Sequence, residues 1–285
     1  MCRLLALVAN QPTRVAGSLL RAPHSLCRQS ACDAQQQKHD NGWGLGYYVH
    51  GQAQRVRSVL PADQDPQFRR AAESLTTSIL LAHIRRASMG EVAVRNSHPF
   101  VYGPWLFAHN GTLFGFDKDR DGLRRLILPQ LLPEIKGDTD SEHAFFLFLS
   151  LLEGRDDPAA ALAQTLHTLA NLYPGTGSEL SQLNFVATDG RQLLASRWHH
   201  SLSWLRRRGE DPNNPDRPMV EGTDYRAVVI ASEPTTSEAW EEVPDQTILN
   251  VHPGLTTSIL ECGDSSPLLL GGQAPKNGGA SKTEN

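Results

Sequence analysis

The chain opens with MCRLLALV at residues 1–8, and the part from residue 2 to residue 8 is a short apolar run typical of a buried β-strand. A cysteine stands directly before this run. Because Cys2 is small, Met1 can be removed on maturation, which would leave a thiol and a free α-amine on one residue. A thiol is a nucleophile, and an α-amine with a pKa of about 7.7–8.0 is a base near neutral pH. Cys2 is therefore either an acyl-transfer nucleophile carrying its own base or an ordinary residue at the start of an edge strand.

The size and charge of the chain exclude several classes of partner. It has 285 residues, with 27 basic and 31 acidic side chains and a net charge of −4. This balance favours neither a nucleic acid nor an anionic membrane as a partner. We see no clear domain boundary, so we expect a single domain over residues 1–270 and a flexible, glycine-rich tail over residues 271–285.

The sequence also indicates the compartment. No apolar run approaches the roughly 18–20 residues of a membrane span, and the N-terminal run is too short and interrupted for a signal peptide. The four cysteines form no metal-binding spacing, which is typical of a reducing cytoplasm. We therefore expect a cytoplasmic protein with no metal site.

The order of the predicted elements indicates the fold class. Strands and helices are mixed in the first part of the chain, and a series of short strands follows residue 177, with a hairpin turn at Asp189-Gly190. The pattern predicts an α+β fold with two antiparallel sheets covered by helices. Before residue 177 we expect helices at 13–20, 66–75, 122–132 and 158–172. We also expect a strand at 105–108 that ends in a turn.

Four motifs carry candidate chemistry. HIRRAS (83–88) places Arg85 at a strand end, where its guanidinium could bind a carboxylate or form a surface ion pair. AHNG (108–111) places an amide side chain beside a backbone N–H, which is a candidate oxyanion hole or a plain turn. GDTDSE (137–142) begins a helix, so Asp140 could bind an ammonium group or simply cap the helix. HDNGWGLG (39–46) is a glycine-rich strand entry that needs close backbone approach.

The order of these motifs after Cys2, together with NSHPF (96–100), resembles the class II glutamine amidotransferases, which are N-terminal nucleophile hydrolases. The later segments NFVATDG and VVIASEP are similar to the small free-standing, YafJ-like members, some of which act on γ-glutamyl amides. The resemblance covers most of the chain except the tail. It implies a four-layer αββα sandwich of two antiparallel sheets and an enzyme that needs no cofactor.

The resemblance also implies roles for individual residues. Cys2 would be the nucleophile, while Asn110 and the backbone N–H of Gly111 would form the oxyanion hole. Arg85 and Asp140 would bind the α-carboxylate and α-ammonium groups of a γ-glutamyl substrate. The remaining implied residues are Ser88, which would help to hold the carboxylate, and His98, Gly42 and Trp43, which would support the site.

Two positions depart from the family pattern. Members of this family often have a tryptophan after the motif arginine, and some have a histidine four residues after that arginine. Arg86 and Met89 occupy these positions here. Contacts to the substrate can therefore differ from those of other members, whereas the residues of the core chemistry are present.

The implied reaction is cleavage of the γ-amide of glutamine through a γ-glutamyl thioester on Cys2, which releases glutamate and ammonia. A γ-glutamyl hydrolase acting on a peptide or thiol-pathway intermediate is the alternative, and a silent γ-glutamyl-binding scaffold is a second one. The substrate is thus a small molecule, and an amidotransferase reaction would also need an ammonia-accepting partner protein. The segment 117–122 matches half of a calcium loop, but Leu128 stands where a bidentate glutamate belongs, so we discount it.

Overall fold

The computed structural model describes residues 2–177, 179–209, 214–219 and 224–262. The expected tail, 271–285, lies outside these ranges, and the single domain over 1–270 stays a prediction. The helices are α1 (Leu26–Ala31), α2 (Pro66–Ser74), α3 (Arg120–Arg124), α4 (Asp140–Leu152) and α5 (Pro158–Leu172), with short η segments η1 (Gly17–Arg21), η2 (Val94–Asn96) and η3 (Leu132–Glu134). Within the described ranges, none of the helices has the length and apolar character needed to cross a membrane.

The strands form two large antiparallel sheets and a short hairpin. The first sheet has the order β14-β11-β13-β1-β4-β2-β3, with β12 also paired to β1, and the second has the order β16-β15-β10-β9-β6-β5. The strands are β1 (Arg3–Arg14), β2 (Trp43–Val49), β3 (Gln52–Ser58), β4 (Thr76–Ile84), β5 (Phe100–Tyr102), β6 (Trp105–Thr112), β7 (Gly175–Thr176), β8 (Glu179–Leu180), β9 (Gln182–Thr188), β10 (Leu193–Arg197), β11 (Ser203–Arg208), β12 (Arg217–Pro218), β13 (Arg226–Ala231), β14 (Glu241–Glu242), β15 (Thr247–Val251) and β16 (Thr257–Glu261).

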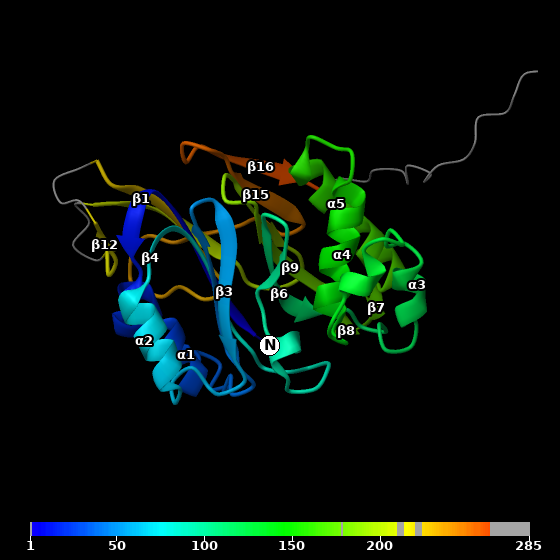
Figure 1. The fold of residues 1–285 in the computed structure, drawn as a ribbon, viewed down its shortest axis with the longest axis horizontal. Helices are drawn as coiled ribbons and strands as arrows, with labels where there is room; N and C mark the ends of the chain where they lie inside the picture. Colours follow the sequence, from blue (N-terminus) through cyan, green and yellow to red (C-terminus); the bar gives the residue numbers. More distant parts are fainter. Residues whose placement is uncertain (1, 178, 210–213, 220–223, 263–285) are drawn as a thin grey trace, which may run out of the picture.

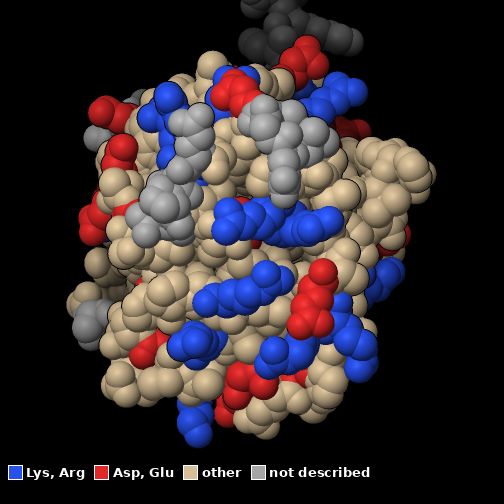
Figure 2. All heavy atoms as spheres, turned by 90° about the vertical axis from the view of Figure 1, so that its left-hand side faces the viewer, with Lys and Arg blue, Asp and Glu red and all other residues tan. Residues whose placement is uncertain are grey.

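The two sheets pack face to face, and each carries helices on its outer face (Figure 1). In Figure 1, α1 and α2 cover the first sheet on the left, while α3, α4 and α5 cover the second on the right. This is the expected four-layer αββα arrangement, which is confirmed. Figure 2 views the α1 and α2 side, where basic side chains lie in several groups with acidic side chains among them.

Strand β1 shows why the sequence folds this way. Leu4, Ala6 and Val8 belong to the apolar core between the sheets, whereas Leu5 and Leu7 belong to the core under α1 and α2. Successive side chains of a strand point to opposite faces, so an unbroken apolar run is what a strand buried on both faces requires. The first residues of the chain thus form a central strand rather than an edge strand.

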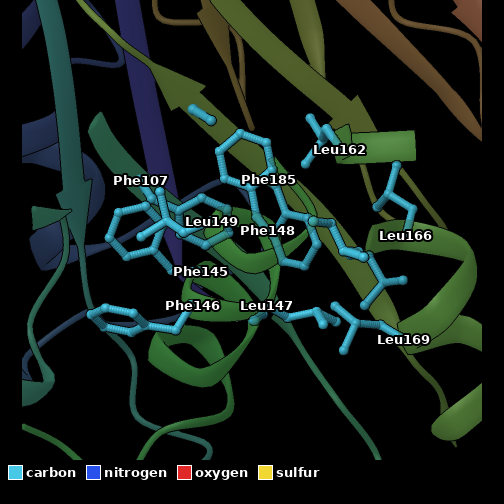
Figure 3. Close-up of a cluster of buried hydrophobic side chains, with 14 of the residues drawn as sticks. Phe107, Phe145, Phe146, Leu147, Phe148, Leu149, Leu162, Leu166, Leu169 and Phe185 are labelled. Atoms are coloured by element: carbon cyan, nitrogen blue, oxygen red, sulfur yellow. The ribbon is translucent and has the colours of Figure 1, made fainter. Parts of the chain in front are cut away.

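A third core, rich in phenylalanine, lies between the second sheet and α4 and α5. Figure 3 shows Phe145 and Phe148 of α4 beside Phe107 of β6, with Leu162 of α5 nearby. The Phe107 and Phe145 rings stack with their centroids 5.1 Å apart. This packing holds the body of α4 against β6.

Two of the expected helices were wrong. The expected helix at 13–20 is not formed, because β1 continues to Arg14 through a bulge between Val8 and Thr13, and only the short η1 follows. Pro12 is tolerated there because bulges need no regular ladder donor. The expected helix at 122–132 is only the short α3, whose N-terminus is capped by Asp119 accepting from the Gly122 N–H.

Candidate functional site

Cys2 and Arg85 lie side by side because β1 and β4 are antiparallel neighbours. Arg3 pairs with Ile84, so the residue before β1 meets the residue after β4. The Cys2 Sγ atom lies 3.4 Å from both the backbone nitrogen and the carbonyl oxygen of Arg86. The half-buried thiol is therefore held against the main chain of the HIRRAS motif.

The Cys2 thiol is not activated by its surroundings alone. Burial raises the pKa of the Cys2 thiol, and the Arg86 N–H and the Arg85 charge only partly oppose this effect. The thiol is therefore protonated at neutral pH, and attack on an amide needs a base to take its proton.

Arg85 is almost fully buried and organises the loop that follows it. Its guanidinium donates to the carbonyl oxygens of Met89 (2.8 Å), Gly90 (3.3 Å) and Glu91 (3.0 Å). Burial lowers the pKa of Arg85, while the charges of Cys2, Asp138 and Asp140 act in the opposite direction. A guanidinium stays charged in proteins, so Arg85 is a fixed cation close to the thiol.

The segment Asn41-Gly42-Trp43 supports this arginine. The Gly42 carbonyl accepts from the Arg85 N–H at 2.7 Å, and the Asn41 side chain accepts from the Ala87 N–H at 2.8 Å. Gly42 has φ +117°, and a Cβ there would lie 2.5 Å from the Ser58 carbonyl oxygen, so only glycine fits. Trp43 is fully buried and donates to Asp65, which anchors the start of β2.

Asn110 and Gly111 lie inside a strand, not in the turn that the sequence suggested. Asn110 pairs with Asn184, and Gly111 pairs with Leu183, so β6 continues to Thr112. The neighbouring β5 pairs with β6 only as far as Phe107, so this part of β6 has β9 on one side and lies beyond the end of β5 on the other. Leu106 and Ala108 belong to the core between the sheets, so alternation along β6 places the Asn110 side chain in the same layer.

The Asn110 side chain is buried with no hydrogen-bond partner within the described structure for either its nitrogen or its oxygen. Its neighbour Asn184 is fully used: its amide donates to the His200 and Ser201 carbonyl oxygens and accepts from the Trp198 N–H. Buried amides are normally paired, so an unpaired one is a candidate ligand-binding group.

Asp140 stands at the first position of α4, where Thr139 caps the helix by accepting from the Glu142 N–H. Its carboxylate accepts from the backbone N–H groups of Leu113 at 2.8 Å and Ser141 at 2.7 Å. The carboxylate is thereby tied to the chain that leaves β6. Because Asp140 acts electrostatically on both Cys2 and Arg85, the structure brings these three predicted residues together.

A cleft of about 910 Å³ opens beside these groups. It is lined by Ser88, one of the predicted residues, and by neighbours of the others: Arg86 and Met89 on one side, Thr112 and Leu113 on another. The Ser88 and Thr112 hydroxyls are 2.8 Å apart and join the two sides. Arg86 and Met89, the two positions that depart from the family pattern the sequence resembles, therefore line this cleft.

His98 lies behind the site rather than in it. Its ring packs 4.2 Å from that of His83 and 4.7 Å from that of Phe100, measured between centroids. The loop bearing His98 approaches β2 so closely that a Cβ on Gly44 would meet the His98 carbonyl oxygen at 2.0 Å. The close approach expected from the glycines of this segment is confirmed.

Sequence reasoning missed one connection in the site. The His109 ring lies 2.9 Å from the Ser141 hydroxyl and 2.8 Å from the Gln182 carbonyl oxygen, and it thereby connects the start of α4 to β9. The signal was present in the AHNG motif, where His109 stands directly before Asn110. Alternation along a strand predicts that these two side chains point to opposite faces.

With this geometry in place, comparison with known proteins gives the class. The family model "Glutamine amidotransferases class-II" matches residues 1–267. The chain belongs to this family and is an enzyme of the glutamine amidotransferase or γ-glutamyl hydrolase type.

Relatives and a solved structure agree with this membership. The chain is 30% identical over 268 residues to the γ-glutamyl-hercynylcysteine sulfoxide hydrolase of Mycobacterium tuberculosis, covering 92% of this chain and 97% of that protein. It is 28% identical over 262 residues to the putative glutamine amidotransferase YafJ of Escherichia coli, covering 85% and 94%. A glutamine aminotransferase class-II domain protein from Silicibacter pomeroyi has the same fold, with a TM-score of 0.62 at 24% identity, covering 92% of this chain and 100% of that one.

Proposed function

We propose that this protein is a cysteine-dependent amidohydrolase that cleaves the γ-amide of glutamine through a γ-glutamyl thioester on Cys2. The observation that supports this most directly is the position of Asn110. Its buried amide has no partner among the described residues, and it follows His109, whose carbonyl oxygen lies 3.2 Å from the ring of His83, two residues before Arg85. A buried hydrogen-bond donor without an acceptor lowers the stability of the fold, unless a ligand or reaction intermediate accepts from it.

Substrate binding would use the two fixed charges. Arg85 would hold the α-carboxylate of the glutamyl group, with the Ser88 hydroxyl beside it. Asp140 would hold the α-ammonium group, since its carboxylate is already aligned by two backbone N–H groups. Binding both ends of the amino acid directs the γ-amide to the thiol, which converts attack into an intramolecular step.

The reaction needs Met1 to be removed, so that Cys2 carries a free α-amine. The amine takes the thiol proton while sulfur attacks the amide carbon. The resulting oxyanion accepts hydrogen bonds from the Asn110 side chain and the Gly111 N–H. The C–N bond then breaks, the leaving ammonia takes the proton from the α-ammonium, and a γ-glutamyl thioester remains. Water, deprotonated by the α-amine, hydrolyses the thioester and restores the thiol.

A γ-glutamyl compound with a larger leaving amine is the second candidate substrate. The cleft of about 910 Å³ lies at the upper end of the size range of small-molecule sites and leaves room for a substrate larger than glutamine. The relative from Mycobacterium tuberculosis is also named as a hydrolase of a γ-glutamyl compound. In this case the leaving amine would occupy the part of the cleft lined by Arg86 and Met89.

The test measures glutamate release from glutamine, glutathione and other γ-glutamyl compounds by protein whose mass shows loss of Met1. We expect Cys2→Ala to abolish release, and Cys27→Ala, the same change at another half-buried free cysteine, to keep it. The substrate with the highest kcat/KM distinguishes glutamine from larger γ-glutamyl amides. Activity that persists in Cys2→Ala, or in protein that retains Met1, would overturn the mechanism.

A further inference from the structure

The position of Cys2 poses a mechanical problem. Pairing of β1 with β4 begins at Arg3, so Cys2 lies just outside the hydrogen-bonded part of the sheet. Residues at chain ends are mobile unless something fixes them. After removal of Met1, no preceding residue would hold Cys2, yet a nucleophile must be placed to within a fraction of an ångström.

Arg3 supplies a direct contact to the main chain of Cys2. Its Nη1 donates to the Cys2 carbonyl oxygen at 3.1 Å. Its other guanidinium nitrogens are held by two acids: Nη2 contacts Asp33 at 2.5 Å, and Nε contacts Glu233 at 3.2 Å. The Arg3 and Asp33 side chains are 2% and 0% exposed, so water cannot substitute for these bonds.

Asp33 is itself fixed on all sides. One carboxylate oxygen accepts from the backbone N–H groups of Gln35 and Gln37, both at 2.9 Å, and the other lies 2.9 Å from the His39 Nε2. Burial lowers the pKa of His39 to about 4, so its ring is neutral at neutral pH and donates its Nε2–H to the carboxylate. Arg3 therefore donates to a carboxylate whose position is fixed by its own hydrogen bonds.

Folding stability alone does not explain the pairing of Arg3 with Asp33 and Glu233. A buried ion pair contributes little net free energy of folding, because its desolvation offsets the attraction. The network also gathers segments from distant parts of the chain, since Asp33 follows α1, His39 precedes β2 and Glu233 follows β13. All of them converge on the residue that follows the nucleophile.

We propose that Arg3, held by Asp33 and Glu233, is a positioning residue that fixes the main chain of Cys2 and thereby aims its thiol and α-amine at the substrate amide. The proposal rests on the function proposed above for Cys2. It adds a role for Arg3, Asp33 and His39, which take no part in the chemical steps.

The decisive variant is Asp33→Asn, with Asp216→Asn as the matched control. An asparagine at position 33 presents N–H groups to Arg3, so the arginine loses its main acceptor while the volume hardly changes. Asp216 forms a comparable buried pair with Arg207 at 2.8 Å, both side chains being 0% exposed. Arg207 pairs with Ala227, which pairs with Ala9, so this control lies about 23 Å from Cys2 at ~3.3 Å per residue along β1.

Steady-state kinetics, thermal unfolding and Cys2 alkylation are compared for the two variants on the best substrate of the panel. We expect both to unfold at a lower temperature, but only Asp33→Asn to lower kcat, by about ten- to a hundred-fold, because misplacement of a reacting group costs that much. The KM of Asp33→Asn should stay near that of the wild type, since Arg85 and Asp140 are untouched. The alkylation rate of Cys2 should change only in this variant.

If wild type is active and Asp33→Asn keeps kcat within about twofold of Asp216→Asn, the positioning role is refuted while the proposed function stands. A rise in KM with unchanged kcat would also refute it, because that result places the network in substrate binding. If wild type shows no Cys2-dependent release, the proposed function fails first. A second variant is Arg3→Lys, which keeps the positive charge but lacks the planar group that donates to three acceptors at once. We expect its kcat to be lowered as in Asp33→Asn.

Discussion

At the residue scale, the two facing asparagines of β6 and β9 differ in how their side-chain amides are paired. Asn110 and Asn184 are cross-strand partners, buried to the same degree. Asn184 satisfies three backbone groups, whereas neither polar atom of the Asn110 side chain has a partner among the described residues. A buried polar side chain that forms no hydrogen bond does not stabilise the fold. A function explains such a residue better than folding does.

We therefore expect Asn110→Ala and Asn184→Ala to have opposite effects. Asn110→Ala should lower kcat by about 10²- to 10³-fold through loss of an oxyanion donor. Its free energy of unfolding should be unchanged or higher, because an unpaired amide is removed. Asn184→Ala should lower the free energy of unfolding by about 1–3 kcal/mol for each group left unpaired. Denaturant unfolding and kinetics of both variants check this.

The contrary result would be equal destabilisation by the two variants with kcat preserved in Asn110→Ala. Asn110 would then be a structural residue, and the oxyanion would need other donors.

At the element scale, α4 connects the apolar core to the site. Its N-terminus carries Asp140, and its body carries Phe145 and Phe148, which pack against Phe107 of β6 (Figure 3). The strand that bears Asn110 and the helix that bears Asp140 are thus held together by the same aromatic cluster. Register and packing of these two elements set the distance between the two groups.

Truncation of this cluster should weaken the fold strongly. Phe148 is fully buried and also contacts the Trp105 ring, with centroids 5.1 Å apart. We expect Phe148→Ala to lower the free energy of unfolding by about 3–5 kcal/mol, because it removes a large buried side chain and leaves a cavity. Leu152→Ala, at a partly buried position near the end of the same helix, should cost clearly less. Equal losses in chemical denaturation would contradict this account of the core.

At the scale of the whole molecule, buried histidines make the fold sensitive to acid. Burial lowers the pKa of His39 and His200 to about 4 and that of His83 to about 3, and burial also lowers the pKa of His98 and His143. In the unfolded chain each would have a pKa of about 6.5. Between these values the unfolded state binds more protons than the folded state, so stability rises with pH and falls on acidification.

We therefore expect the unfolding temperature to fall steadily as the pH drops from about 6.5 towards 4, by the linkage of proton binding to unfolding. The carboxyls of Glu142 and Asp216, whose pKa values are raised by burial, work in the opposite direction, but the histidines outnumber them. His200→Gln removes one titrating group and should make the slope shallower. Calorimetry across this range measures both slopes, and a flat profile for wild type would contradict the prediction.

The sequence by itself determined the architecture and the set of candidate residues. An unbroken apolar run after Cys2 marks a strand buried on both faces, and periodicity located α5 at its observed bounds. The order of the motifs identified the family, because each motif carries a residue type that the chemistry requires. These signals are local, so they can be read before the chain is folded.

The tertiary structure alone decided how those residues are combined. Asn110-Gly111 reads locally as a turn, but pairing with β9 forces it into a strand. The contact of Arg3 with Asp33 and Glu233 joins positions 30 and 230 residues apart, which no local pattern can indicate. Long-range pairing and burial override local preference because they satisfy many backbone groups at once. The sequence singled out Cys2 as the candidate nucleophile, and the fold determined which residues surround it.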